Sequence, residues 1–198
     1  MQQQSNSAND PRLSVAIFAS GNGTNFEAIA TADLPIDIKL LVCDHHDAYV
    51  LKRAAKFGVP ALVIEAKKGI SKQHREQTIL RHLRAEGVEA IFLAGYMRII
   101  GPTLLDAFAK RIINIHPALL PNFPGLHGIE DAYAANVKET GVTIHYIDSG
   151  VDTGQIIAQQ SVPRYPDDSV TDLATRIHDV EHQLYPNTIL DLIKKGVL

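Results

Sequence analysis

The sequence predicts an α/β fold in which helices flank a central, mostly parallel sheet. Short apolar runs alternate with helix-like segments along the first two thirds of the chain. The runs at 13–19 (LSVAIFA) and 90–94 (AIFLA) contain almost no polar residues, so strands formed from them need cover on both faces. Strands of this kind belong to parallel sheets that carry helices on both sides.

Each predicted element rests on local signals. Gly58 and Pro60 end the second helix, and Ile79, Leu80 and Leu83 give the third helix one apolar face. The predicted strands lie at 13–19, 36–43, 61–64, 90–94 and 112–115, and the predicted helices at 26–31, 48–57 and 71–86.

The last third of the chain has a different pattern. Two β-rich runs at 142–147 and 155–162 are separated only by a loop, so we expect them to pair antiparallel or to extend the sheet in a mixed fashion. A final helix is expected from Ser169, a favourable N-cap, to about Lys195, with a break or kink at Pro186. Residues 117–136 are predicted to form a long site loop or lid.

Composition sets the outer limits. The chain has 198 residues, of which 45% are hydrophobic and 21% charged, as in ordinary globular proteins. A net charge of -3 predicts no broad surface for nucleic acid, and no apolar stretch reaches membrane-spanning length. The single cysteine, Cys43, suits a reducing compartment, and the first ten residues lack a signal-peptide core. We therefore expect a disordered tail at 1–11, one domain at 12–198 and a cytoplasmic location.

A glycine loop follows the first strand. Residues 20–25 (SGNGTN) lead into a helix, whose N-terminal N–H groups attract phosphate, and glycine lets the anion approach. Phe26 stands where a dinucleotide fingerprint has its third glycine, and the Gly-Lys-Ser/Thr of a triphosphate loop is absent. Asp44, roughly 20 residues on, keeps a dinucleotide-binding interpretation open. A tight turn without a ligand is the other alternative.

Three polar residues near strand ends are candidate catalytic groups. Asn114 and His116 are two positions apart on an extended strand, so their side chains point to the same face. An amide beside an imidazolium can stabilise an oxyanion, and losing one such donor costs about 3 kcal/mol. Asp152 lies in a turn after another apolar run, and its carboxylate would favour the charged imidazole. The alternatives are a structural histidine at a strand end and an ordinary turn aspartate.

A metal-ligand spacing occurs on the final helix, where His178 and His182 are four residues apart. Position 179 is not glutamate, and no third ligand is evident, so we expect no metal site.

Several segments in a fixed order carry a family resemblance. They are SGNGTN at 20–25, AGYMRII at 94–100, NIHPALLPNFPGLHG at 114–128, GVDTGQII at 150–157 and EHQLYP at 181–186. The chain resembles the phosphoribosylglycinamide formyltransferase family over about residues 12 to 195. This resemblance implies a Rossmann-like formyltransferase fold. It also implies transfer of a formyl group from 10-formyltetrahydrofolate to the glycyl amine of 5-phosphoribosylglycinamide (glycinamide ribonucleotide). This reaction is a step of de novo purine biosynthesis. It implies small-molecule partners, no metal and a homodimer.

The resemblance also implies residue roles. Ribonucleotide binding is expected at Gly23, Thr24 and Asn25, which seat the phosphate, and at Glu181, which contacts the ribose hydroxyls. The catalytic residues are expected to be Asn114, His116 and Asp152. Folate binding is expected at Met97, Arg98, Ile99, Ile100, Asn114 and Asp148. Asp148 begins a turn at 148–152 that is expected to close around the pterin. A basic residue that contacts the folate is expected at Lys72, with Arg75 as the alternative.

Two mild departures from the family pattern are Ala118 after His-Pro and Gln155 after the turn.

Four other functions remain open. A formyltetrahydrofolate hydrolase usually has an extra N-terminal domain, and a methionyl-tRNA formyltransferase an extra C-terminal one. A dinucleotide-binding protein would use Asp44 on a ribose. A non-catalytic binding module would show no chemical phenotype when His116 is replaced.

Overall fold

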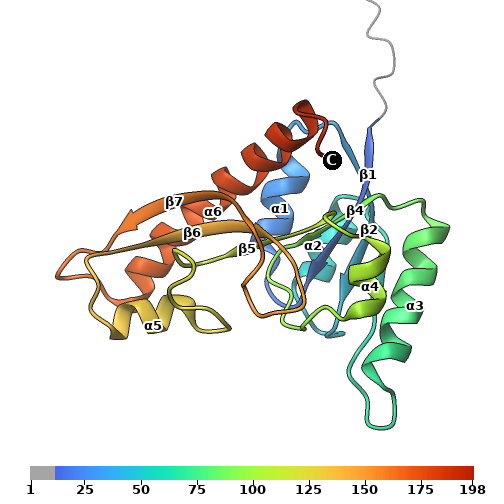
Figure 1. Ribbon diagram of the computed structural model, residues 1–198, viewed down its shortest axis with the longest axis horizontal. Coiled ribbons are helices and arrows are strands. Elements are labelled where there is room, and N and C mark those ends of the chain that lie inside the picture. The colour runs from blue at the N-terminus through green and yellow to red at the C-terminus, as the bar shows by residue number, and fades with distance from the viewer. Residues whose placement is uncertain (1–11) are drawn as a thin grey trace, which may run out of the picture.

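The computed structural model describes residues 12–198, so the tail expected at 1–11 lies outside the described part. Within the described residues the strands are β1 (Leu13–Ala19), β2 (Ile36–Cys43), β3 (Ala61–Val63), β4 (Ala90–Leu93), β5 (Ile112–His116), β6 (Glu139–Tyr146) and β7 (Ile156–Pro163). The helices are α1 (Thr24–Thr31), α2 (Val50–Lys56), α3 (Lys72–Ala85), α4 (Pro102–Ala107), α5 (Gly128–Ala134) and α6 (Val170–Lys194). Figure 1 shows their arrangement.

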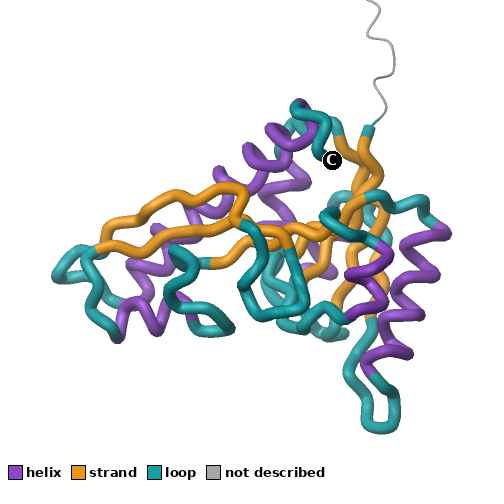
Figure 2. Tube along the Cα trace, viewed as in Figure 1, coloured by secondary structure: helices purple, strands orange, loops and turns teal. Residues whose placement is uncertain are grey.

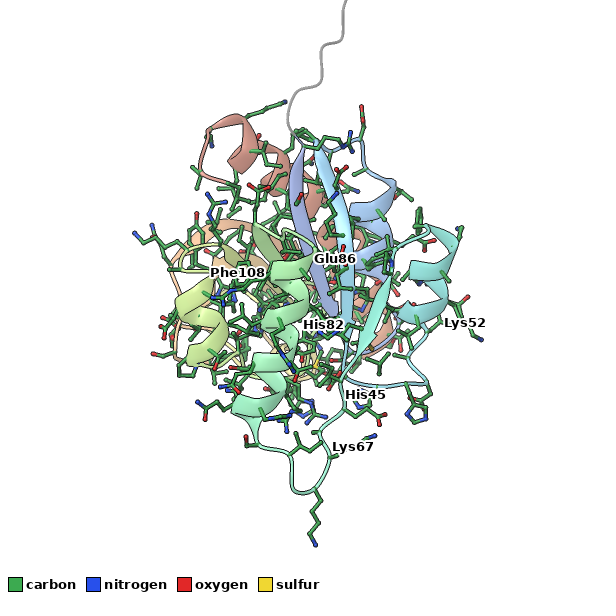
Figure 3. All side chains as sticks on the ribbon, turned by 90° about the vertical axis from the view of Figure 1, so that its right-hand side faces the viewer. His45, Lys52, Lys67, His82, Glu86 and Phe108 are labelled. Atoms are coloured by element: carbon green, nitrogen blue, oxygen red, sulfur yellow. The ribbon has the colours of Figure 1, made fainter. Side chains whose placement is uncertain are left out.

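The sheet has the strand order β3-β2-β1-β4-β5-β6-β7. Neighbours from β3 to β5 are parallel, whereas β6 and β7 are antiparallel additions. The predicted mostly parallel sheet with an antiparallel C-terminal extension is therefore confirmed. The chain order reverses between β1 and β4, and ligands of open α/β sheets bind beyond the carboxyl ends of the strands at such a point. His45 lies just beyond the end of β2, at this end of the sheet (Figure 3).

Apolar side chains cover both faces of the sheet. In β1, Val15 and Ile17 belong to one buried cluster, whereas Ala16 and Phe18 belong to the other, as the alternation of strand side chains requires. Residues of α1, α2 and α6 complete the first cluster, and residues of α3 and α4 complete the second. Burying these side chains gives the sheet its main stabilisation, at roughly 25 cal/mol per Å² of apolar surface.

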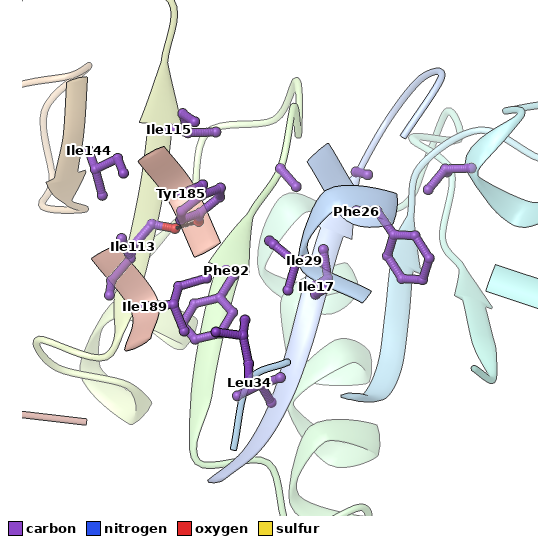
Figure 4. Close-up of a cluster of buried hydrophobic side chains, with 14 of the residues drawn as sticks. Ile17, Phe26, Ile29, Leu34, Phe92, Ile113, Ile115, Ile144, Tyr185 and Ile189 are labelled. Carbon is purple, nitrogen blue, oxygen red and sulfur yellow. Dashed lines mark hydrogen bonds between the residues drawn. The ribbon is translucent and has the colours of Figure 1, made fainter. Parts of the chain in front are cut away.

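The long helix α6 is anchored beneath the centre of the sheet by Tyr185. Its ring packs against Phe92 with ring centroids 6.3 Å apart, and Figure 4 shows it beside Ile113. The Tyr185 hydroxyl lies 2.9 Å from the Ile113 carbonyl and 3.1 Å from the Leu93 carbonyl. Ser169 caps the helix as expected. Of the break or kink expected at Pro186, the break is wrong, because α6 continues through this residue. Pro186 lies on the buried face, where packing outweighs one lost hydrogen bond.

Two short helices depart from the sequence prediction. α4 was not expected, and α5 lies inside the segment 117–136 that was predicted to be loop throughout (Figure 2). Both have seven residues or fewer, so the periodic signal is too short to separate a helix from a turn. Within residues 12–198, none of the helices combines the length and the apolar character that crossing a membrane requires.

Candidate active site

A cavity of about 780 Å³ opens at the carboxyl ends of β1, β4 and β5. Five parts of the chain supply most of its lining: the glycine loop, residues 93–100, residues 114–117, the turn near 147–152 and two side chains of α6. His45, Gly125 and Leu126 complete the lining. The topology brings these segments together, because the three strands end at the same edge of the sheet.

The glycine loop is braced from behind by α2. Gly23 has a φ of 80°, and a Cβ added to it would lie 2.4 Å from Cγ2 of Val50. The Val50 N–H donates to the Gly21 carbonyl at 3.0 Å. Arg53 donates to the backbone carbonyl of Asn22 at 2.9 Å and to its side-chain oxygen at 2.8 Å, and it also pairs with Glu27. This bracing fixes the loop at the start of α1, where unbonded N–H groups suit an anion.

At the far side of the loop, Asn25 and Glu181 join α1 to α6. Asn25 Nδ2 donates to Glu181 Oε2 at 3.1 Å, and His178 Nδ1 lies 2.8 Å from the same oxygen. The hydrogen bond with Glu181 raises the pKa of His178 above its usual 6.5. All three side chains line the cavity. They surround a polar corner next to the loop that suits the hydroxyl groups of a sugar.

The His178–His182 pair shows no metal-site geometry. The two rings stack with centroids 6.5 Å apart, and His178 is committed to Glu181. In the described part of the chain, no group of three or more His, Cys, Asp or Glu side chains is arranged to hold a metal ion.

Asn114 and His116 both point into the cavity from β5, as their spacing predicted. His116 is 3% exposed, and its Nε2 lies 2.8 Å from the Phe123 carbonyl. A carbonyl oxygen can only accept, so Nε2 carries the hydrogen. Nδ1 then faces Asp152, with 3.6 Å between Nδ1 and Oδ2. A second proton on Nδ1 would give an imidazolium with a hydrogen-bond acceptor on one side and a carboxylate on the other.

Asp152 is held in place by its backbone and by a loop N–H. Its φ of 53° is left-handed, a conformation that aspartate tolerates better than most residues, and Oδ2 accepts from the Gly125 N–H at 2.8 Å. Burial raises the pKa of Asp152, but hydrogen bonds from His145 and Gly125, with the charge of His116, outweigh it. The net pKa lies below the usual 3.8, so the group is a carboxylate at neutral pH.

His145, a fully buried residue of β6, also belongs to the site, although it was not among the residues predicted from the sequence. It pairs in register with Asn114, and its Nε2 lies 3.2 Å from Asn114 Nδ2 and 3.5 Å from Asp152 Oδ1. Its Nδ1 lies 2.9 Å from the Tyr146 carbonyl and therefore carries a hydrogen. The ring lies against both the Asn114 amide and the Asp152 carboxylate. An amide hydrogen of Asn114 can still point to a ligand. The signal was an imidazole within the apolar run at 142–147.

The proposed folate residues divide between two adjoining cavities. Met97, Arg98, Ile99 and Ile100 line both the large cavity and a smaller one of about 320 Å³. Lys72 and Arg75 both line the smaller cavity only, and Asp148 lines the large one only. Asp148 accepts from Thr153 Oγ1 at 2.7 Å and from the Gly150 N–H at 3.0 Å, which shapes the turn. The departures Ala118 and Gln155 line neither cavity.

Asp44 does not offer a free acceptor for a dinucleotide ribose. The residue is 2% exposed, and both carboxylate oxygens are engaged inside the protein: Oδ2 with Arg98 Nε at 2.6 Å and Oδ1 with His45 Nδ1 at 2.9 Å. The dinucleotide alternative depended on this carboxylate, so the geometry removes its main support.

Comparisons with known proteins agree with this geometry. Residues 13–189 match the family model described as formyl transferase, and the chain belongs to this family. It is 47% identical over 182 residues to a phosphoribosylglycinamide formyltransferase of Bacillus subtilis (strain 168), covering 90% of this chain and 93% of that protein.

Solved structures show the same fold. The crystal structure of glycinamide ribonucleotide transformylase 1 from Geobacillus kaustophilus is 51% identical with a TM-score of 0.88, covering 91% of this chain and 98% of that one. The phosphoribosylglycinamide formyltransferase from Bacillus halodurans is 48% identical with a TM-score of 0.90, covering 92% and 96%. The family resemblance and the Rossmann-like formyltransferase fold expected from the sequence are confirmed.

Proposed function

We propose that this protein transfers the formyl group of 10-formyltetrahydrofolate to the glycyl amine of 5-phosphoribosylglycinamide in de novo purine biosynthesis. The observation that carries the proposal is the convergence of Asn114, His116 and Asp152 in a cavity that also contains a braced glycine loop. The names of the similar proteins support the same reaction.

The two substrates occupy different ends of the cavity. The phosphate of the ribonucleotide binds the N–H groups of Gly23, Thr24 and Asn25, and Glu181 accepts from the ribose hydroxyls. This assignment is supported by the position of Glu181, 3.1 Å from Asn25 across the same corner. The folate lies along residues 97–100 and under the turn that contains Asp148, supported by the exposed apolar side chains of Met97 and Ile99.

The reaction requires an oxyanion to be stabilised. The glycyl amine attacks the formyl carbon, and a new N–C bond forms while the carbonyl oxygen takes the negative charge. An amide hydrogen of Asn114 and the positive charge of the His116 imidazolium stabilise this oxygen. The bond from carbon to N10 then breaks, and the proton that the attacking amine loses passes by way of His116 to N10. Asp152 keeps the imidazole charged and oriented, and no metal takes part.

Binding both substrates side by side also contributes, because it makes a bimolecular reaction effectively unimolecular. We infer that residues 12–198 act as one formyltransferase domain, supported by the single seven-stranded sheet, whose strands extend from residue 13 to residue 163, and by the packing of α6 against it. We place the protein in the cytoplasm, supported by its buried, unpaired Cys43.

The test is an absorbance assay for deformylated folate with and without 5-phosphoribosylglycinamide, run on the wild type and on His116→Ala. Acceptor-dependent release by the wild type and its loss in the variant support the proposal. Equal release without the acceptor would instead show that the protein is a formyltetrahydrofolate hydrolase. A His116→Ala variant that is folded and fully active would show that other residues carry out the chemistry.

A further inference from the structure

Asp44 is a buried carboxylate for which the catalytic scheme above has no role. It follows β2 directly, and it is 2% exposed. Burial raises its pKa, but hydrogen bonds from Ser20, Arg98 and His45 lower the pKa below the usual 3.8. A charged group this deeply buried is costly unless its partners are fixed, so the positions of these partners deserve a functional explanation.

Two of the three partners of Asp44, Ser20 and Arg98, belong to segments that line the large cavity. Ser20 begins the glycine loop, and its hydroxyl also accepts from the Met97 N–H at 2.8 Å. The Ser20 N–H donates to the Gly95 carbonyl at 3.0 Å. Asp44 and Ser20 therefore hold the segment 95–98 from two sides, at the point where it enters the folate-lining region.

Arg98 is held in a manner that leaves part of its guanidinium free. Asp44 Oδ2 accepts from Nε at 2.6 Å, and no hydrogen bond from elsewhere in residues 12–198 engages the two terminal nitrogens. The side chain is 44% exposed and lines both cavities. Because the guanidinium is planar, fixing Nε sets the direction of the two terminal amino groups.

We propose that Asp44 is a positioning residue for the folate donor: it orients Arg98 so that the terminal nitrogens bind a carboxylate of the donor's glutamate end. The inference rests on the proposed function for its ligand but concerns a residue outside the catalytic trio. Orientation matters because a free arginine loses much rotamer entropy when it binds, and the ion pair with Asp44 removes that cost in advance.

The first test is Asp44→Asn, which keeps the size of the side chain and removes its charge. We expect the KM for 10-formyltetrahydrofolate to rise about tenfold, as for the loss of one charge-assisted hydrogen bond, with kcat and the ribonucleotide KM within about twofold. The matched control is Asp37→Asn, at the other end of β2, where the carboxylate pairs on the surface with Arg12 and Lys39. It should leave all three constants unchanged.

A double-mutant cycle separates positioning from simple structural support. Arg98→Ala should raise the folate KM by itself, and adding Asp44→Asn should then change nothing further. An equal effect of Asp44→Asn in both backgrounds would show that Asp44 does not act through Arg98. A loss of thermal stability with unchanged kinetic constants, or an equal rise of both KM values, would also overturn the proposal.

Direct binding keeps this inference independent of the transfer assay. Calorimetric titration with 5-formyltetrahydrofolate should show the weakened affinity of Asp44→Asn. The primary amide of 5-formyltetrahydropteroic acid, which has no carboxylate, should bind both proteins alike. An affinity loss of the same size for both compounds would contradict the role of Arg98. Failure of the wild type to transfer formyl groups, with these titrations as expected, would reject the proposed reaction and leave the positioning role intact.

Discussion

Oδ2 of Asp152 lies 3.6 Å from Nδ1 of His116, and a left-handed backbone at Asp152, with φ 53°, places it there. Residues held in this region cost free energy unless the surroundings determine them, and they concentrate at functional sites. The Gly125 N–H and His145 hold the carboxylate from two other directions. The strain therefore serves to fix a charge beside the imidazole ring.

Asp152→Asn isolates the charge from the backbone, because asparagine also tolerates the left-handed conformation. We expect turnover to fall at least about tenfold, since a neutral amide no longer favours the imidazolium, while thermal stability changes little. Asp152→Ala should lose the same activity and be less stable as well, because alanine is strained at φ 53°. Steady-state kinetics and thermal melts of both variants decide the matter, and wild-type turnover in Asp152→Asn would exclude the charge from the mechanism.

Asn114→Ala and His116→Ala should each reduce kcat about a hundredfold or more, because each removes a group that stabilises the oxyanion. Single-turnover measurements on the folded variants test this directly. Ser161→Ala, an exposed position on β7, serves as the control and should retain full activity. Near-normal turnover in either cavity variant would contradict the catalytic assignment.

Gly23→Ala should weaken ribonucleotide binding while folate binding stays unchanged. The new Cβ would lie 2.4 Å from Val50, so the loop must move away from the geometry that presents its N–H groups. Gly58→Ala is a matched control, because Gly58 also has positive φ, at 68°, but has open space around its Cβ position. Titration of both ligands against both variants is the measurement. Equal losses of folate and ribonucleotide affinity for Gly23→Ala would argue against a phosphate role.

Arg53→Ala should raise the KM for the ribonucleotide several-fold and leave the folate KM unchanged, because the two hydrogen bonds to Asn22 that brace the glycine loop are lost. Lys52→Ala, one residue earlier on α2, is the control, since Lys52 contacts the Tyr49 ring 5.5 Å from its centroid. The two KM values of each variant are compared with those of the wild type. A larger effect from Lys52 than from Arg53 would refute the bracing.

Acid stability should depend on Asp168. Its hydrogen bonds with Arg176 and the Tyr165 N–H lower its pKa from 3.8 to about 2. A depressed pKa in the folded state stabilises the protein above pH 3.8, and this contribution is lost as the pH falls toward 2. The stability difference between wild type and Asp168→Asn should therefore shrink between these pH values, as urea unfolding at a series of pH values will show. A constant difference in stability between the two proteins across that pH range would mean that the ion pair of Asp168 does not cause the loss of stability in acid.

Much of the candidate site could be predicted from local sequence. The shared face of Asn114 and His116 follows from the two-residue period of a strand, and the glycine loop follows from its place between a strand and a helix. Ser169 was predicted as the N-cap of the last helix and is one, because capping depends on neighbouring residues alone. The order of strands and helices has the same local origin, with the short α4 and α5 as exceptions.

Only the tertiary structure decided which distant residues meet. His145 reaches Asn114 because β6 pairs antiparallel with β5 in one register, and a shift by one residue would turn it to the other face. Asp44 meets Arg98 because β2 and β4 flank β1 and end at the same edge of the sheet. The sequence by itself determined periodicity, caps and turns, since these depend on adjacent residues. Register and strand order depend on packing summed over the whole core, and local sequence carries too little of that information.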